Sequence, residues 1–155
     1  MAFTFVENNN GNVMETFDLA ISINPDAAII SQVYDSGTEA AGTIAVENTG
    51  GVNAALFLTA DWGATAPTTD REATLLANAL MVSVVVSSDD EAVPTSTFYV
   101  GRLIDLIDVP VFNSLGAGNQ ADVHVSVTLP DTHSGPALLD KRLASDLVFV
   151  AVSVA

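Results

Sequence analysis

Residues able to act in catalysis are few in this sequence. A nucleophilic triad needs a general base beside its nucleophile. The chain has no cysteine, and its histidines are His124 and His133. His124 alternates with valines in a strand pattern that turns it to solvent, and His133 lies in a Pro-Asp-Thr-His-Ser-Gly stretch typical of a loop. Because no Gly-x-Ser-x-Gly nucleophile elbow accompanies them, the sequence predicts a protein that is not an enzyme.

Carboxylates are the other candidates, as ligands of a metal ion. Asp89, Asp90 and Glu91 follow an apolar run and could offer oxygen ligands to calcium. The defined spacing with glycine that calcium loops show is missing, so a solvated loop is the preferred interpretation, and Asp105 and Asp108 are interpreted in the same way. No His-Glu-x-x-His sequence is present, which argues against a zincin site. We predict no cofactor, with calcium as the weaker alternative.

The charge of the chain limits its partners. It carries 19 Asp and Glu against four Lys and Arg, a net charge of −15, which disfavours nucleic acid and anionic lipid surfaces. The excess either serves solubility or sets carboxylates against each other in an assembly, where cations would have to screen them. No apolar run approaches the ~20 residues needed to cross a bilayer, so membrane insertion is not expected.

The elements that would position any site are mostly strands. Apolar residues alternate with polar or small ones, the pattern of a strand with one buried face, in runs from 17 to 23, 43 to 47 and 122 to 129. Two more uniformly apolar runs, from 81 to 86 and 147 to 154, are typical of central strands. This arrangement predicts an all-β antiparallel sandwich or barrel.

Turns and helices complete this prediction. Asn- and Gly-rich stretches at 8–12, 48–51 and 116–119 predict hairpin turns. One helix is expected after Thr68 or Thr69, where Asp70 and Glu72 suit the helix N-terminus and Leu75, Leu76, Ala79 and Leu80 form an apolar stripe. A shorter helical turn is expected within residues 101–106.

The N-terminus is the most unusual region. Phe3, Thr4, Phe5 and Val6 form a short β-prone strand, and polar and glycine residues separate it from the rest. Such an apolar strand on a tether is an aggregation hazard without a partner. It either folds back as a strand of its own sandwich or completes the sheet of a neighbouring copy. We therefore divide the chain into a strand and tether, residues 1–12, and a sandwich domain, residues 13–155.

The order of these features resembles the TasA/camelysin family of surface and biofilm-fibre proteins. The resemblance rests on the strands and Asn-x-Gly turn of residues 41–60, the Thr-x-Asp-Leu strand from Thr16, the helix and strand of residues 75–84, and the entry to the penultimate strand at 115–123. It implies a jelly-roll-like sandwich with one or two short helices, exported to the cell surface. Camelysin carries a metalloprotease label, but this chain has no recognisable zinc-ligand set.

The resemblance also implies a function. Fibres of the biofilm matrix and related archaeal bundling pili are built from such domains by donor-strand exchange, in which an N-terminal strand enters the next subunit. We therefore expect a structural subunit of an extracellular filament that pairs with copies of itself through Phe3, Thr4, Phe5 and Val6. The alternative is a monomeric surface adhesion or binding sandwich in which that strand folds back.

Overall fold

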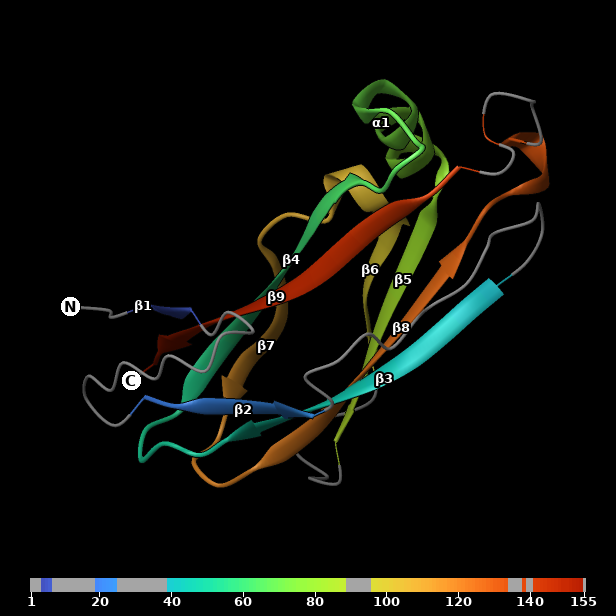
Figure 1. The fold of residues 1–155 in the computed structure, drawn as a ribbon. Coiled ribbons are helices and arrows are strands. Elements are labelled where there is room, and N and C mark those ends of the chain that lie inside the picture. Colours follow the sequence, from blue (N-terminus) through green and yellow to red (C-terminus); the bar gives the residue numbers. More distant parts are fainter. Residues whose placement is uncertain are drawn as a thin grey trace.

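The computed structural model places the strands in two antiparallel sheets, as the sequence predicts for an all-β sandwich (Figure 1). It describes residues 4–6, 19–24, 39–88, 96–133, 138 and 141–154. Sheet A has the order β1-β9-β4-β7, and sheet B has the order β2-β3-β8-β5-β6. The strands of sheet A are β1 (Thr4–Val6), β9 (Leu143–Ser153), β4 (Ala54–Ala64) and β7 (Val109–Leu115). Those of sheet B are β2 (Ile21–Asn24), β3 (Glu39–Asn48), β8 (Gln120–Thr128), β5 (Met81–Ser88) and β6 (Ser96–Arg102).

The core between the sheets follows from the two-residue period. In β8 and just beyond it, Val123, Val125, Val127 and Leu129 are buried, whereas His124 is exposed. The inner face of sheet A supplies Leu56, Leu58 and Phe149, all nearly inaccessible to solvent. Polar–apolar alternation therefore identifies the inner face of the central strands.

Two strand predictions needed revision. β9 begins at Leu143, four residues before the apolar run that marked it, because its first half carries exposed Ser145 and Asp146. No strand was expected over β7, whose Pro110 and exposed Asn113 interrupt any simple pattern. β7 is an edge strand of sheet A, and an edge tolerates proline because one side of the strand needs no ladder partner.

The turns predicted as hairpins at 48–51 and 116–119 are not hairpins. The first leads from β3 in sheet B to β4 in sheet A, and the second leads from β7 in sheet A to β8 in sheet B. Gly118 has φ of +77°, a conformation that glycine adopts without steric cost. Both turns are therefore sheet-crossing connections at one end of the sandwich. The predicted turn at 8–12 lies outside the described residues.

The predicted helix forms at the opposite end. α1 (Asp70–Ala79) is capped by Thr69, whose side chain accepts a hydrogen bond from the Glu72 amide while the Glu72 carboxylate accepts one from the Thr69 amide. This capping box satisfies two backbone donors of the first turn. The predicted second helical element is a short 3₁₀ turn, η1 (Leu103–Asp105), and another 3₁₀ turn, η2 (Asp131–His133), follows β8. Within the described residues, no helix is long and apolar enough to span a membrane.

Asn48 holds the two sheet-crossing turns together. Its side chain has no solvent exposure, and its Nδ2 donates 2.8 Å hydrogen bonds to the carbonyl oxygens of Val52 and Leu115. Its Oδ1 accepts from the Gly50 amide, its own amide donates to the Asn119 carbonyl, and its own carbonyl accepts from the Gly118 amide. One asparagine thus joins the ends of both sheets.

We expect Asn48→Ala to lower the free energy of unfolding by about 3 kcal/mol, because three side-chain hydrogen bonds are lost at about 1 kcal/mol each and buried carbonyls stay unpaired. Urea unfolding followed by circular dichroism measures this loss. Asn113→Ala, at an exposed position of β7, is the matched control and should change stability little. Equal effects of the two substitutions would contradict the role of Asn48.

The register of β8 is tested by adjacent substitutions. Val125→Asp puts an unpaired charge into the core and should unfold the domain, whereas His124→Asp at the exposed neighbouring position should be tolerated. Thermal melts of both variants give the comparison. If His124→Asp were as damaging as Val125→Asp, the outer face of sheet B would have to be covered as well.

Candidate assembly edge

The N-terminal strand lies at the edge of sheet A. Thr4, Phe5 and Val6 form β1, which pairs antiparallel with Val152, Ala151 and Val150 of β9. The sequence analysis also assigned Phe3 to this strand, but Phe3 lies outside the described residues, as do residues 7–18, where the division at residue 12 falls. The register sets Phe5 opposite Ala151, which is buried in the core.

The edge of β9 extends well beyond β1. On its other side β9 pairs with β4 along its whole length, from Leu143 opposite Ala64 to Ser153 opposite Ala54. On the β1 side, no described residue pairs with the stretch from 143 to 149. Most of this edge therefore presents backbone donors and acceptors that no described strand satisfies, which is the template that an added strand uses.

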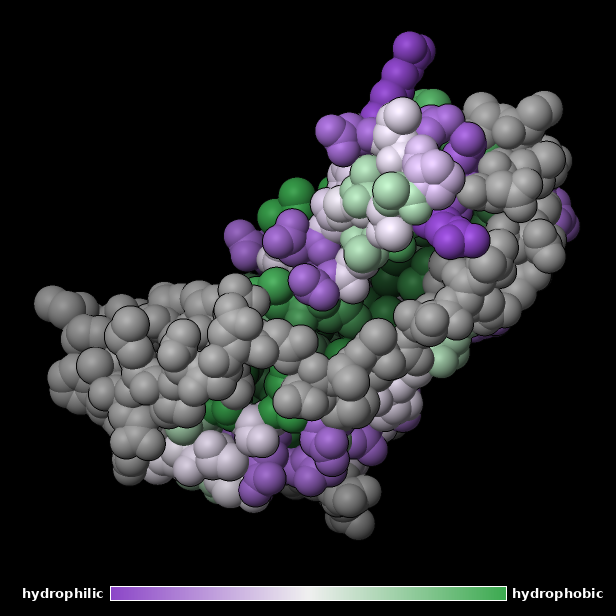
Figure 2. Space-filling view, in the orientation of Figure 1, coloured by the Kyte–Doolittle hydropathy of each residue, from purple (hydrophilic) through white to green (hydrophobic). Residues whose placement is uncertain are grey.

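Hydrophobic residues can be seen in the middle of the molecule, at the bottom of a hollow (Figure 2). Figure 2 shows hydrophobic residues in a hollow between the polar residues around α1 and those of the lower sheet. Leu143 and Leu147 of β9 are only half-buried and pack against the core from this strand. Unpaired backbone and adjoining apolar surface are what an incoming strand with alternating apolar side chains requires.

The residues weighed for catalysis do not form an acid–base pair. The ring of His124 is hydrogen-bonded through Nδ1 to Thr43 Oγ1 at 2.8 Å and through Nε2 to Ser87 Oγ at 2.9 Å. These three side chains lie on adjacent strands of the exposed outer face of sheet B, and no carboxylate orients the ring through either nitrogen. The backbone of His133 ends η2, and its side chain lies outside the described part of the structure.

The residues weighed as metal ligands are also dispersed where the structure describes them. Asp105 pairs with Arg102 at 2.7 Å, and Asp108 accepts a 3.2 Å hydrogen bond from Thr59. Within the described residues, no group of three His, Asp or Glu side chains could hold a metal ion. Asp89, Asp90 and Glu91 lie outside the described residues, so the calcium alternative stays a prediction.

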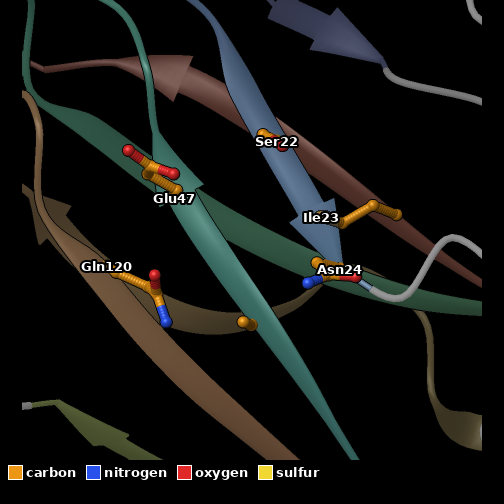
Figure 3. Close-up of a pocket in the computed structure, with 6 residues that line it drawn as sticks. Ser22, Ile23, Asn24, Glu47 and Gln120 are labelled. Atoms are coloured by element: carbon orange, nitrogen blue, oxygen red, sulfur yellow. The ribbon is translucent and has the colours of Figure 1, made fainter.

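A pocket that the sequence analysis did not predict lies on sheet B. A cavity of about 480 Å³ is lined by residues of β2, β3 and β8 (Figure 3), namely Ser22, Ile23, Asn24, Ala45, Glu47 and Gln120. Glu47 is the charged residue of this lining, and the lining includes no histidine. These side chains become neighbours through strand pairing, such as Ser22 with Glu47 and Glu47 with Gln120, which no local motif indicates.

The end of the sandwich near α1 is held by an ion pair. Lys141 Nζ lies 2.7 Å from Glu72 Oε1, and the Arg142 amide donates a 2.8 Å hydrogen bond to Thr68 Oγ1. The hydrogen bond from Lys141, followed by those from Thr69, lowers the pKa of Glu72 to about 2. These contacts fix the start of β9 against the start of α1.

No protein-family model and no curated protein sequence matches this chain significantly. The resemblance to the TasA/camelysin family therefore stays a prediction, and a functional proposal has to rest mainly on the structure.

The Glu72 contact predicts a pH dependence of stability. The pKa of Glu72 is lower in the folded chain than its ordinary value of 4.5, so its ionised form stabilises the fold above pH 4.5 and this contribution is lost as the pH falls toward 2. The difference in melting temperature between the wild type and Glu72→Gln should therefore shrink over this range. A difference that stayed constant from pH 6 to pH 2 would contradict the role of the carboxylate.

Proposed function

We propose that this protein is a structural subunit of an extracellular filament that assembles by donor-strand exchange. The observation that carries the proposal is the β9 edge, of which β1 covers only Val150 to Val152. The strand from Phe3 to Val6 leaves its own β9 and pairs with the β9 edge of a neighbouring copy. The resemblance to biofilm-fibre proteins supports export and fibre formation, and the long β9 edge supports the mode of assembly.

The energy of such a contact favours stable filaments. Burial of Phe3 and Phe5 contributes roughly 1.5–3 kcal/mol each in transfer free energy, and each added backbone hydrogen bond contributes about 1 kcal/mol net. Three residues of β1 already pair with β9 of their own chain, so exchange gains only the part of this energy that comes from pairing and burial beyond those three residues. The sum is repeated at every subunit contact.

The second candidate function is a monomeric surface adhesion or binding domain. The pairing of β1 with β9 of the same chain favours it, because a folded-back strand leaves no donor for a neighbour. The cavity bounded by Ser22, Glu47 and Gln120 is then the candidate binding surface. The two functions differ in one measurable respect, which is whether β1 pairs within a chain or between chains.

Engineered cysteines distinguish these pairings, since the natural chain contains none. Thr4 lies opposite Val152, and the Cα separation of such antiparallel partners allows a disulfide. We expect an oxidised mixture of Thr4→Cys chains with Val152→Cys or Val148→Cys chains to give heterodimers linked by a disulfide, together with filaments in negative-stain images. A mixture with His124→Cys chains, altered on the other sheet, is the control and should give none.

The opposite result is equally clear. If the double variant Thr4→Cys/Val152→Cys forms only the bond within one chain, both mixtures stay monomeric, and the full-length protein gives dispersed particles, strand exchange is wrong. The adhesion-domain function would then take its place.

A further inference from the structure

All Lys and Arg residues of the chain lie at one end of the sandwich. The chain has four of them, and each lies on or beside α1. Arg71 belongs to the helix, Lys141 pairs with Glu72 of the helix, the Arg142 amide bonds Thr68, and Arg102 donates a 3.1 Å hydrogen bond to Asn78 of the helix. Every other part of the molecule is without a Lys or Arg.

This end also holds carboxylates, among them Asp70, Glu72 and Asp105, and two of its four cations form no ion pair within the described part of the chain. Arg102 pairs with Asp105 and Lys141 with Glu72. Arg71 and Arg142 are exposed and form no ion pair with any described residue. Arg71 stands in the first turn of α1, where a positive charge opposes the helix dipole. Helix stability therefore does not explain Arg71, and a contact outside the domain would.

The opposite end of the sandwich is acidic. Glu47 and Asp122 lie on β3 and β8, and the register pairs Asp122 with Ala45, two residues before Glu47, so the carboxylates are diagonal neighbours on the outer face. Asp122 also lies opposite Ser87 of β5. Ser87 is six residues from Met81, the residue of β5 beside α1, so at 3.3 Å per residue Asp122 lies about 20 Å from the α1 end of the sandwich. β1 lies at this same acidic end (Figure 1), because it pairs with the last residues of β9 whereas Arg142 precedes the first.

We propose that Arg71 and Arg142, at the end of one copy that holds all the Lys and Arg residues (the cationic end), dock on Glu47 and Asp122 at the opposite end of the next copy, which holds carboxylates without Lys or Arg (the acidic end). That this contact lies along the axis of a filament rests on the proposed strand exchange. The uneven distribution of Lys and Arg between the two ends does not depend on it. Head-to-tail contacts between different surfaces do not close on themselves and generate open filaments. Because each copy carries a net charge of −15, the contact between the ends has to form against an overall repulsion between the copies.

This docking also brings donor and acceptor together. The β1 of the incoming copy lies at its acidic end, and the stretch 143–149 of β9, which no described strand pairs with on that side, begins beside the cationic end of the receiving copy. In its own chain β1 runs antiparallel to β9. If neighbouring copies are related by a shift along the long axis of the sandwich, the β1 of one copy is therefore also antiparallel to the β9 of the next copy. The opposite charges of the two ends therefore align each subunit before its strand transfers.

Charge variants of the full-length protein test the contact. R71E/R142E should slow filament growth, followed by light scattering at low salt, by tenfold or more. E47K/D122K should also slow it, although it lowers the net negative charge and with it the overall repulsion. The variant with all four changes keeps the net charge of the wild type and the complementarity of the ends, so its growth rate should recover. Salt screens both this contact and the overall repulsion between the copies, so all variants are compared at the same salt concentration.

The controls separate this inference from strand exchange. The control variant D61N/D146N removes two exposed negative charges from sheet A. The test variant E47Q/D122N removes the same number from the acidic end, and its filaments should grow more slowly than those of the control. If E47K/D122K grows faster than the wild type, or if the four-change variant does not recover, the end contact is wrong. Strand exchange is not contradicted by this result as long as filaments still form. If no filaments form, strand exchange is wrong, and the end contact is tested by sedimentation. Salt-sensitive self-association that the same variants weaken and restore would support the end contact, and a lack of self-association would overturn it.

Discussion

The buried side chain of Asn48 is the contact on which the arrangement of the two sheets depends. Asn48 ends β3 of sheet B, donates to the carbonyls of Val52, which precedes β4, and Leu115 of β7, both on the side of sheet A, and accepts from the turn that follows it. Each of these polar groups would be costly to leave unpaired without water. The strands that it joins, β3 and β4, therefore leave this end in fixed directions.

Much of the fold could be predicted because its signals are local. Alternation identified the buried face of β8, and a capping threonine at 68 or 69, followed by Asp70 and Glu72, marked the start of α1. The turns at 48–51 and 116–119 were recognised from Asn and Gly, but their role as sheet crossings was not. Local residues specify a change of chain direction, whereas the choice between pairing in one sheet and crossing to the other depends on contacts such as Asn48 with Leu115, 67 positions away.

The candidate site was only half predictable for the same reason. Phe3 to Val6 stand out as an apolar strand among polar neighbours, so the donor could be named from the sequence. The acceptor could not, because the free edge of β9 is defined by which strands fail to cover it. The cations gave no signal either, since Arg71, Arg102 and Arg142 are far apart in sequence and meet only because α1, β6 and β9 converge at one end of the sandwich.

The pairing of β4 with β9 also affects how the chain can fold as it is synthesised. β4 lies at residues 54–64, yet its partner on one side consists of residues 143–153. Its other partner, β7, forms only a short and irregular ladder with it. Pairing across so many intervening residues is slow, and the apolar β4 must wait for the last strand to leave the ribosome. Because β9 completes the pairing of β4, sheet A can close only after residues 143–153 have been synthesised.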